Sequence, residues 1–239
     1  MDIVLIAGLW LDGSSWAEVV PHLEAAGHRA HALTLPGMES VDADRSAISL
    51  ADHVAAVVAA IDAVDGREQV VLVGHSAGAA VAHGAIDVRP NRVARAVYIG
   101  GFPAADGEAV VDGLAGDAPD VPLPDWSEFD DEEIRDLDED ARVRFRQRAI
   151  PSPAGVVRGP QRLVDERRYR VPVSTICTEF TPGQLRDWID KDLAPVRELA
   201  RISNVDMVDL DGGHWPQFTR PAELAQLIIE AIHQPIAPS

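Results

Sequence analysis

This chain of 239 residues contains one cysteine, one lysine and no long apolar run. With Cys177 alone, no intrachain disulfide can form, and no cysteines and histidines are spaced as in a structural zinc site. No segment approaches the roughly 20 apolar residues that span a bilayer, and the N-terminus lacks the basic residues and apolar length of a secretory signal. We therefore expect no structural metal and no membrane anchor, with the cytoplasm as the default compartment.

Basic residues are also scarce, with 21 Lys and Arg against 39 Asp and Glu, which gives a net charge of −18. Phosphate backbones and anionic lipid surfaces are bound by basic patches, so the composition argues against nucleic acid and membrane as partners. The chain is instead rich in hydrophobic residues (46%), enough to bury one large core. The sequence leaves the oligomeric state open, a homodimer included.

Short runs rich in β-branched residues alternate with alanine-rich amphipathic segments. This alternation predicts an α/β fold, a doubly wound and mainly parallel sheet of about six strands with helices on both faces. The expected strands lie near residues 2–6, 30–33, 69–73, 94–99, 171–177 and 206–210. The expected helices lie near residues 15–26, 50–64, 77–88, 182–189 and 221–232.

The stretch between residues 104 and 170 departs from this pattern, because it is rich in proline, glycine and charge. Its acidic runs and the arginines at 142–148 are typical of a solvated helical face. An insertion between two core strands is nevertheless where a lid over a site would lie. We therefore divide the chain into a core of residues 1–103 and 171–239 and a cap or lid insertion of residues 104–170.

The motif Gly74-His75-Ser76-Ala77-Gly78 directly follows the apolar run 69–73. A strand that ends in Gly-x-Ser-x-Gly and turns straight into a helix is a nucleophile elbow, which lifts the serine hydroxyl off the end of a sheet. The N-terminus of the following helix offers unpaired N–H groups and the positive end of its dipole to a developing oxyanion. Ser76 is therefore the candidate nucleophile.

A serine hydroxyl is a weak nucleophile and needs a base, for which the chain offers eight histidines. His214 stands in the glycine-marked loop 211–216, between the last expected strand and the last expected helix. That place is the carboxyl edge of the sheet, where ligands bind in open α/β folds. The chain order, nucleophile first and histidine last, favours His214 as the base over the alternative of a solvent-exposed loop histidine.

An oxyanion hole needs two donors near the reacting oxygen. The N–H of Ala77, directly after the nucleophile, is the first candidate. The second is the N–H of Leu9, in the loop 7–13 that follows the first expected strand, where Gly8 relieves crowding. An ordinary connection between strand and helix is the alternative interpretation of this loop.

Together these motifs resemble the α/β-hydrolase family, and most closely its compact branch of plant methylesterases and hydroxynitrile lyases. The resemblance rests on the first strand and its loop through Trp16, the elbow, Phe102-Pro103, the segment 175–179, and the Gly-x-His loop with the Pro221 helix. It implies a parallel sheet with a small cap after the strand near 94–99. It also implies a triad of serine, histidine and acid that needs no cofactor and no metal.

The acid departs from the pattern of these relatives. Many of them read Cys-Thr-Glu-Asp with the aspartate in the triad, whereas this chain reads Cys177-Thr178-Glu179-Phe180. The acid must accept the Nδ1–H of the histidine and fix its tautomer. Glu179 is the first candidate, Asp106 in the loop after the preceding strand is the second, and Asp187 is the third.

The surroundings of the base and of the first loop depart as well. Hydroxynitrile lyases of this branch carry a lysine directly after the catalytic histidine and a threonine at the position of Gly8. In this chain Trp215 follows His214, and the single lysine is Lys191. The resemblance therefore argues against lyase activity. Many relatives also carry His-Gly where this chain has Ala7-Gly8.

The expected activity is hydrolysis of a carboxylic ester of a small, apolar substrate through an acyl-enzyme intermediate. A lactone, a thioester or an aryl ester would suit the same residues. The rival interpretations are a ligand-binding receptor with little turnover, and perhydrolase or cofactor-free oxygen chemistry. The candidate pocket walls, whose alternative is ordinary packing of core and cap, are Trp10, Leu11, Phe102, Trp126 and Trp215.

Overall fold

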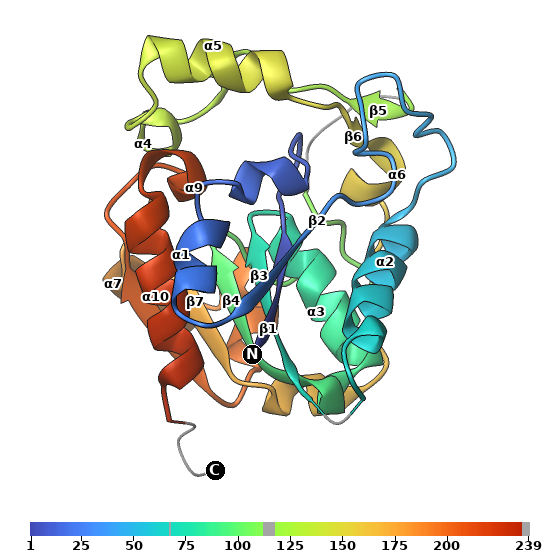
Figure 1. Ribbon diagram of the computed structural model, residues 1–239, viewed down its shortest axis with the longest axis vertical. Coiled ribbons are helices and arrows are strands. Elements are labelled where there is room, and N and C mark those ends of the chain that lie inside the picture. Colours follow the sequence, from blue (N-terminus) through green and yellow to red (C-terminus); the bar gives the residue numbers. More distant parts are fainter. Residues whose placement is uncertain (67, 112–117, 236–239) are drawn as a thin grey trace.

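The computed structural model, which describes residues 1–66, 68–111 and 118–235, contains a six-stranded, fully parallel sheet (Figure 1). This confirms the predicted fold class. The strand order is β2-β1-β3-β4-β7-β8, so the chain reverses its direction of winding between β1 and β3. The strands are β1 (Asp2–Ile6), β2 (Arg29–Leu33), β3 (Val70–His75), β4 (Val93–Ile99), β7 (Val173–Cys177) and β8 (Val205–Asp209).

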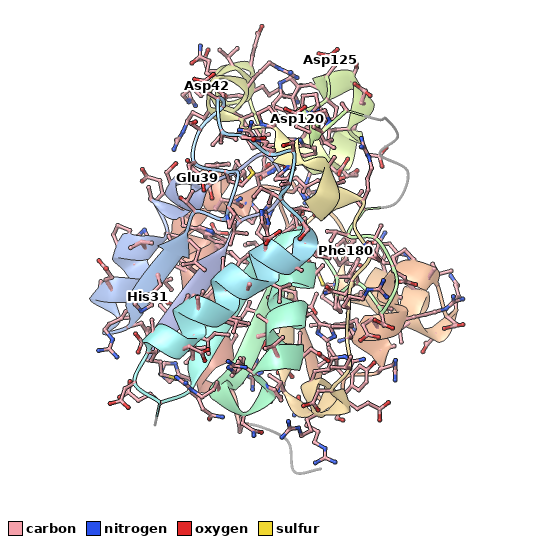
Figure 2. All side chains as sticks on the ribbon, turned by 90° about the vertical axis from the view of Figure 1, so that its right-hand side faces the viewer. His31, Glu39, Asp42, Asp120, Asp125 and Phe180 are labelled. Carbon is pink, nitrogen blue, oxygen red and sulfur yellow. The ribbon has the colours of Figure 1, made fainter. Side chains whose placement is uncertain are left out.

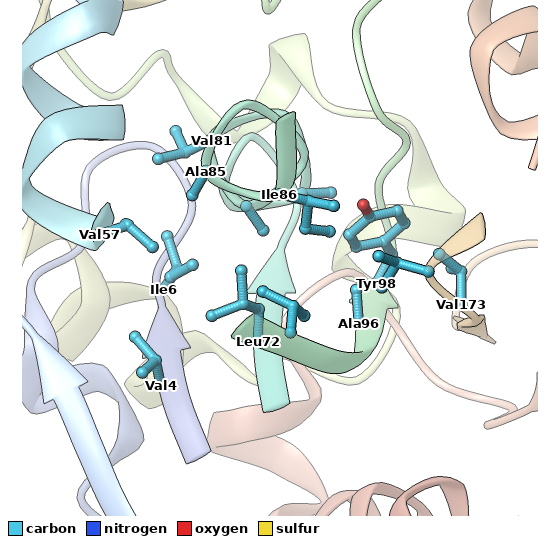
Figure 3. Packing of buried hydrophobic residues seen from close by; sticks show 14 of the residues in the cluster. Val4, Ile6, Val57, Leu72, Val81, Ala85, Ile86, Ala96, Tyr98 and Val173 are labelled. Carbon is cyan, nitrogen blue, oxygen red and sulfur yellow. The ribbon is translucent and has the colours of Figure 1, made fainter. Parts of the chain in front are cut away.

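Helices cover both faces of the sheet, and the side chains of the strands alternate between them. Val4, Ile6 and Leu72 pack beneath α2 (Leu50–Ala63) and α3 (Gly78–Val88), where Figure 3 shows them against Val57 and Val81. The intervening residues pack on the other face, against α1 (Val20–Ala25) and α10 (Pro221–His233). Two apolar layers on one sheet explain why β1 and β3 are buried over their whole length.

The prediction of one continuous helix over residues 15–26 is wrong. The chain forms a short 3₁₀ helix, η1 (Gly13–Trp16), and then begins α1 at Val20. Pro21 explains the break, because proline has no N–H to donate and its ring clashes with the preceding turn of a helix. It is tolerated here because it lies in the first turn of α1.

Most elements of the segment expected to form the cap, residues 104–170, lie above the carboxyl ends of the strands, whereas its last element lies near their amino ends, directly before β7 (Figure 1). We refer to this segment as the cap. Its described elements are β5 (Asp120–Val121), η3 (Trp126–Glu128), α4 (Asp131–Ile134), α5 (Glu139–Arg148), β6 (Ser152–Pro153), α6 (Ala154–Val157) and η4 (Glu166–Arg170). No helix in the described part of the chain is long and apolar enough to cross a membrane.

A buried polar network fastens the end of the cap to the core. Glu198, in α8 (Arg197–Ala200), accepts hydrogen bonds from Arg168 Nε at 3.1 Å and from the Tyr169 hydroxyl at 3.1 Å, and its carboxylate lies 3.0 Å from His83 Nε2. Arg168 Nη1 donates a hydrogen bond to Asp87 Oδ1, in α3, at 3.1 Å. All five side chains are buried. The charged groups have therefore lost their hydration, and the hydrogen bonds and ion pairs within the network offset that cost.

We expect Glu198→Gln to lower the free energy of unfolding by about 3 kcal/mol, because it removes one partner from a buried set of charges. Urea denaturation at neutral pH measures the change. Glu223→Gln is the matched control, since Glu223 pairs with Arg220 at the surface and its side chain is 62% exposed. Equal midpoints for the two variants would contradict a stabilising role of the network.

Candidate active site

The carboxyl edge of the sheet brings together the three residues expected to form a triad. Ser76 follows β3, Glu179 follows β7, and His214 lies in the loop after β8. The edge also includes the end of β1, next to β3, where the winding of the sheet reverses. Ligands of open α/β sheets bind at this kind of position.

Ser76 occupies a sharp turn between β3 and α3. Its φ of 53° lies in the left-handed region, which a serine adopts only where its surroundings enforce it. The Ser76 N–H donates to the Ile99 carbonyl at 2.8 Å, which fixes the turn to β4. A Cβ on Gly78 would lie 2.6 Å from the Ile6 carbonyl oxygen, so only glycine lets α3 start this close to β1.

A continuous chain of hydrogen bonds joins the three side chains. His214 Nε2 lies 2.8 Å from Ser76 Oγ, and His214 Nδ1 lies 2.8 Å from Glu179 Oε1. The other carboxylate oxygen of Glu179 accepts a hydrogen bond from the Thr178 hydroxyl. With Nδ1–H donating to the carboxylate, Nε2 is the free acceptor that faces the serine hydroxyl.

The other candidate acids lie elsewhere. Asp106 accepts the backbone N–H of Leu163 at 2.9 Å, inside the cap. Asp187 lies on the exposed side of α7 (Pro182–Asp190). Of the three candidates, Glu179 is the one that the fold places against His214.

The electrostatics of the pair favour its charged form. Burial raises the pKa of the Glu179 carboxyl, but the adjacent His214 and the hydrogen bonds from His214 and Thr178 outweigh burial and hold it at about 2. Burial lowers the pKa of His214, and the charge and hydrogen bond of Glu179 outweigh burial and raise the pKa above its ordinary value. An imidazolium formed when His214 takes a proton is therefore stabilised.

The loop after β1 lies directly against the nucleophile. A Cβ on Gly8 would lie 2.8 Å from the Cβ of Ser76, so this contact requires glycine. In the described part of the chain, neither the N–H of Leu9 nor that of Ala77 donates a hydrogen bond to a protein acceptor. Both N–H groups belong to segments next to Ser76, and their role as an oxyanion hole stays a prediction.

Trp10 fixes this loop to the cap through contacts that could not be predicted from the sequence. Its φ of 64° is left-handed, and its N–H donates to Ser152 Oγ at 2.8 Å. The Trp10 carbonyl accepts the N–H of Ile150 at 2.9 Å, and its indole N–H donates to the Val121 carbonyl at 3.1 Å. The strained backbone of Trp10 is thus held by three hydrogen bonds, all to the cap.

His75 has a role in the site that the sequence analysis did not assign. Its Nε2–H donates to the His214 carbonyl at 2.7 Å, and its Nδ1 lies 3.3 Å from the side-chain amide nitrogen of Gln217. Complete burial lowers the pKa of His75 to about 3, so the ring is neutral and keeps this arrangement. Its place directly before the nucleophile was the available signal, but the partner is a backbone atom 139 residues away.

The five candidate pocket residues do not form one surface. Trp10, Trp126 and Trp215 belong to an aromatic cluster between cap and core, in which the Trp215 ring lies 5.1 Å from that of Phe145 and is 1% exposed. Phe102 lies instead in a second cluster, 5.3 Å from the ring of Phe180, with Trp188 beside both.

Leu11 lines a cavity of about 400 Å³ between η1, α5 and Phe218. The residues that line this cavity do not include Ser76 or His214. The aromatic cluster separates the two places, because Phe145 lines the cavity and Trp215, which contacts Phe145, lies 4.9 Å from the ring of His214.

The site thus combines the Ser76 hydroxyl, an imidazole hydrogen-bonded to it and a carboxylate hydrogen-bonded to that imidazole. These are the kinds of group that nucleophilic attack on a carbonyl requires. Among the residues that the structure describes, no three histidine, cysteine or acidic side chains are grouped as a metal would require.

Known proteins match most of the length of this chain. A model of the alpha/beta hydrolase family matches residues 3–227. Methylesterase 7 of Arabidopsis thaliana is 24% identical over 261 residues, covering 95% of this chain and 94% of that protein. A pyrethroid hydrolase of Sphingobium wenxiniae is 35% identical over 106 residues, which cover 44% of this chain and only 38% of that protein.

Solved structures match over nearly the whole chain. An extracellular alpha/beta-hydrolase from a Paenibacillus species superposes with a TM-score of 0.78 at 20% identity, covering 97% of this chain and 98% of that one. A methylesterase from Arabidopsis has a TM-score of 0.75 at 18% identity, with 97% and 98% covered. At these identities, the likeness shows the fold.

We expect Glu179→Gln to lower the pKa of His214, because the variant removes the carboxylate charge but leaves the burial that disfavours imidazolium. NMR titration of the imidazole protons measures the shift, with the wild-type value above the ordinary 6.5 and the variant below it. Asp106→Asn is the matched control and should leave the titration unchanged. A shift in Asp106→Asn, or none in Glu179→Gln, would contradict the assignment of Glu179 as the partner of His214.

Proposed function

Since the chain belongs to the alpha/beta hydrolase family, we propose that it is a serine hydrolase that cleaves a carboxylic ester of a small, apolar substrate. The observation that carries the proposal is the continuous hydrogen-bonded chain from Ser76 through His214 to Glu179, at the carboxyl edge of the sheet. The relatives named as methylesterases and a pyrethroid hydrolase support ester hydrolysis as the reaction class.

The proposed reaction proceeds in two halves. In the first, His214 Nε2 takes the proton of Ser76 while Oγ attacks the ester carbonyl, and the Leu9 and Ala77 N–H groups stabilise the oxyanion. Collapse of the tetrahedral intermediate breaks the bond to the alcohol, which leaves with the proton from His214. In the second half, water gives a proton to His214 and attacks the acyl-enzyme. The bond between the acyl group and Ser76 Oγ then breaks, and His214 returns the proton to Oγ as the acid leaves.

Glu179 serves both halves in the same way. Its carboxylate accepts the Nδ1–H of His214 at 2.8 Å and so keeps Nε2 free to act as the base. When His214 takes the proton, the buried imidazolium faces a carboxylate that is already ionised, since the pKa of Glu179 lies at about 2. The charge that develops on the histidine thus meets a fixed opposite charge.

The charge and apolar surface at the cap end favour an uncharged, apolar substrate. Figure 2 shows Glu39, Asp42, Asp120 and Asp125 all at the cap end of the molecule, where their field repels anions. Beneath them, the cluster of Leu9, Trp126 and other apolar residues includes Ala77, next to the nucleophile. An apolar acyl or alcohol group is therefore the better fit to this side of Ser76.

The structure adds a steric argument against lyase chemistry. A threonine at position 8, as in the hydroxynitrile lyases that the sequence resembles, would place a Cβ 2.8 Å from that of Ser76. The residue after His214 is Trp215, which is packed among aromatic rings and offers no cation.

We expect Ser76→Ala to lower kcat for p-nitrophenyl acetate by a factor on the order of 10⁴ or more, and Glu179→Gln to lower it by a comparable factor. Steady-state hydrolysis measures both, and Asp106→Asn should retain the wild-type kcat. Undiminished turnover in Ser76→Ala would refute the mechanism.

A receptor with the same triad is distinguished by turnover. A fluorophosphonate should label Ser76 in either case, because labelling needs only an activated serine. Turnover of at least one ester, lactone or thioester in a broad panel supports the enzyme, and its preferred substrate identifies the leaving group. Stoichiometric labelling without turnover of any member would favour the receptor.

We expect kcat/KM to rise with pH and to level off above the pKa of His214, since only the neutral imidazole can accept the serine proton. That inflection should lie above 6.5, because Glu179 raises the pKa of His214. In Glu179→Gln the remaining activity should show the inflection at lower pH. The pH dependence of kcat/KM over pH 5–9 tests this, and an inflection that does not move would contradict the coupling.

A further inference from the structure

The loop that carries His214 lies between the nucleophile elbow on one side and the cap on the other. The His214 carbonyl accepts the Nε2–H of His75, from the elbow. The His214 N–H donates to the carbonyl of Glu133, in α4 of the cap, at 2.7 Å. Both backbone groups of the proposed base are thus held by segments distant in sequence, one from the core and one from the cap.

Arg135, directly after α4, holds the same loop at two further points. Its Nε donates to the Gly212 carbonyl at 3.0 Å, and its guanidinium forms an ion pair with Asp211. The side chain of Arg135 is 37% exposed, whereas that of Asp211 is 80% exposed. The ion pair alone is therefore weak, and the bond to the Gly212 carbonyl is the contact that constrains the loop.

Asp136 completes the contact from the cap. A Cβ on Gly213 would lie 2.6 Å from the Glu133 carbonyl oxygen and would overlap Asp136 Oδ1, so the loop and the cap turn touch through backbone. Asp136 Oδ2 accepts the Thr219 hydroxyl at 2.8 Å, which ties the same turn to α9 (Pro216–Thr219). These contacts involve three of the four residues of the turn, since only the buried Ile134 takes no part in them. They also involve every residue of the loop 211–214.

A loop with two consecutive glycines needs such external contacts. Glycine allows the close approach of the cap turn, but it also gives the free loop a wide choice of backbone conformations. The 2.8 Å bonds from His214 to Ser76 and Glu179 require one of those conformations. A displacement of about 1 Å in a catalytic group can cost about 10²-fold in rate.

We propose that the cap turn Glu133–Asp136 positions the general base, with Arg135 as a positioning residue that holds the His214 loop in line with Ser76 and Glu179. This inference rests on the proposed function of His214. It gives the cap a second task besides covering the site: the base is aligned only while the α4 end of the cap is docked on the core.

Arg135→Met tests this in the full chain. It should lower kcat for p-nitrophenyl acetate about tenfold or more, with KM changed less than twofold, because it removes loop contacts and no substrate contact. The inflection of kcat/KM should also move to lower pH, since a misplaced His214 loses part of its interaction with Glu179. Arg135→Lys, which keeps the charge and one donor, should recover part of kcat.

Arg146→Met is the matched control. Arg146 also donates to a backbone carbonyl, that of Pro124, and also pairs with a carboxylate, that of Asp125 at 3.7 Å, but both partners lie inside the cap. Arg146→Met removes one positive charge from the cap, as Arg135→Met does, and the side chain of Arg146 has a similar exposed fraction, 42%. We expect wild-type kcat and an unmoved pH profile for Arg146→Met, whatever its effect on the melting temperature.

The outcomes separate the two proposals. If Ser76→Ala in the same assay is inactive while Arg135→Met matches Arg146→Met in kcat and pH profile, the positioning role is refuted and the proposed function stands. If Ser76→Ala remains active, the proposed function itself fails. Should Arg135→Met not fold, full kcat with an unmoved pH profile in Arg135→Lys at a lowered melting temperature would refute the inference, and a lowered kcat with a moved profile would support it.

Discussion

The close approach of α3 to the ends of β1 and β3 is the constraint on which the rest of the site depends. Gly74 and Gly78 permit it, since a Cβ on either would lie 2.5–2.6 Å from a backbone carbonyl oxygen. The approach forces Ser76 into a left-handed conformation and directs its hydroxyl away from the sheet. Gly8 and Gly101, whose added Cβ atoms would overlap Ser76, continue the same tight backbone packing around the nucleophile. The proposed oxyanion donors follow from this packing, because both belong to the segments that it brings together.

Much of this arrangement could be predicted from local pattern. The strands, the parallel sheet and its two helical layers follow from runs of β-branched residues and their spacing, and the fold prediction is confirmed. The elbow and the Gly-x-His loop could be placed at one edge because carboxyl ends of parallel strands share an edge. Glu179 could be ranked ahead of Asp106 and Asp187 but not chosen outright. The choice depends on which carboxylate lies next to His214 Nδ1, and no local pattern encodes that distance.

The sequence could not predict contacts between residues that lie far apart along the chain and carry no shared motif. His75 donates to the carbonyl of His214, and Trp10 donates to the side chain of Ser152, 142 residues away. Trp215 is a candidate pocket wall in the sequence, yet it packs against three aromatic rings of the cap, those of Trp126, Phe129 and Phe145, and is only 1% exposed. A pattern identifies a residue as apolar but does not say whether it faces a ligand or another side chain.

The cap therefore holds both sides of the proposed reaction centre. Ser152 and Ile150 fix the loop that carries Leu9, and Glu133 and Arg135 fix the loop that carries His214. The network around Glu198 anchors the end of the same segment to α3 and α8. Because the proposed binding surface and the alignment of the proposed catalytic groups both depend on the cap, a cap substitution next to either loop also disturbs the oxyanion donors or the base of the proposed mechanism. A substitution that alters substrate specificity should therefore keep activity best when it lies at a cap residue that contacts neither of these loops.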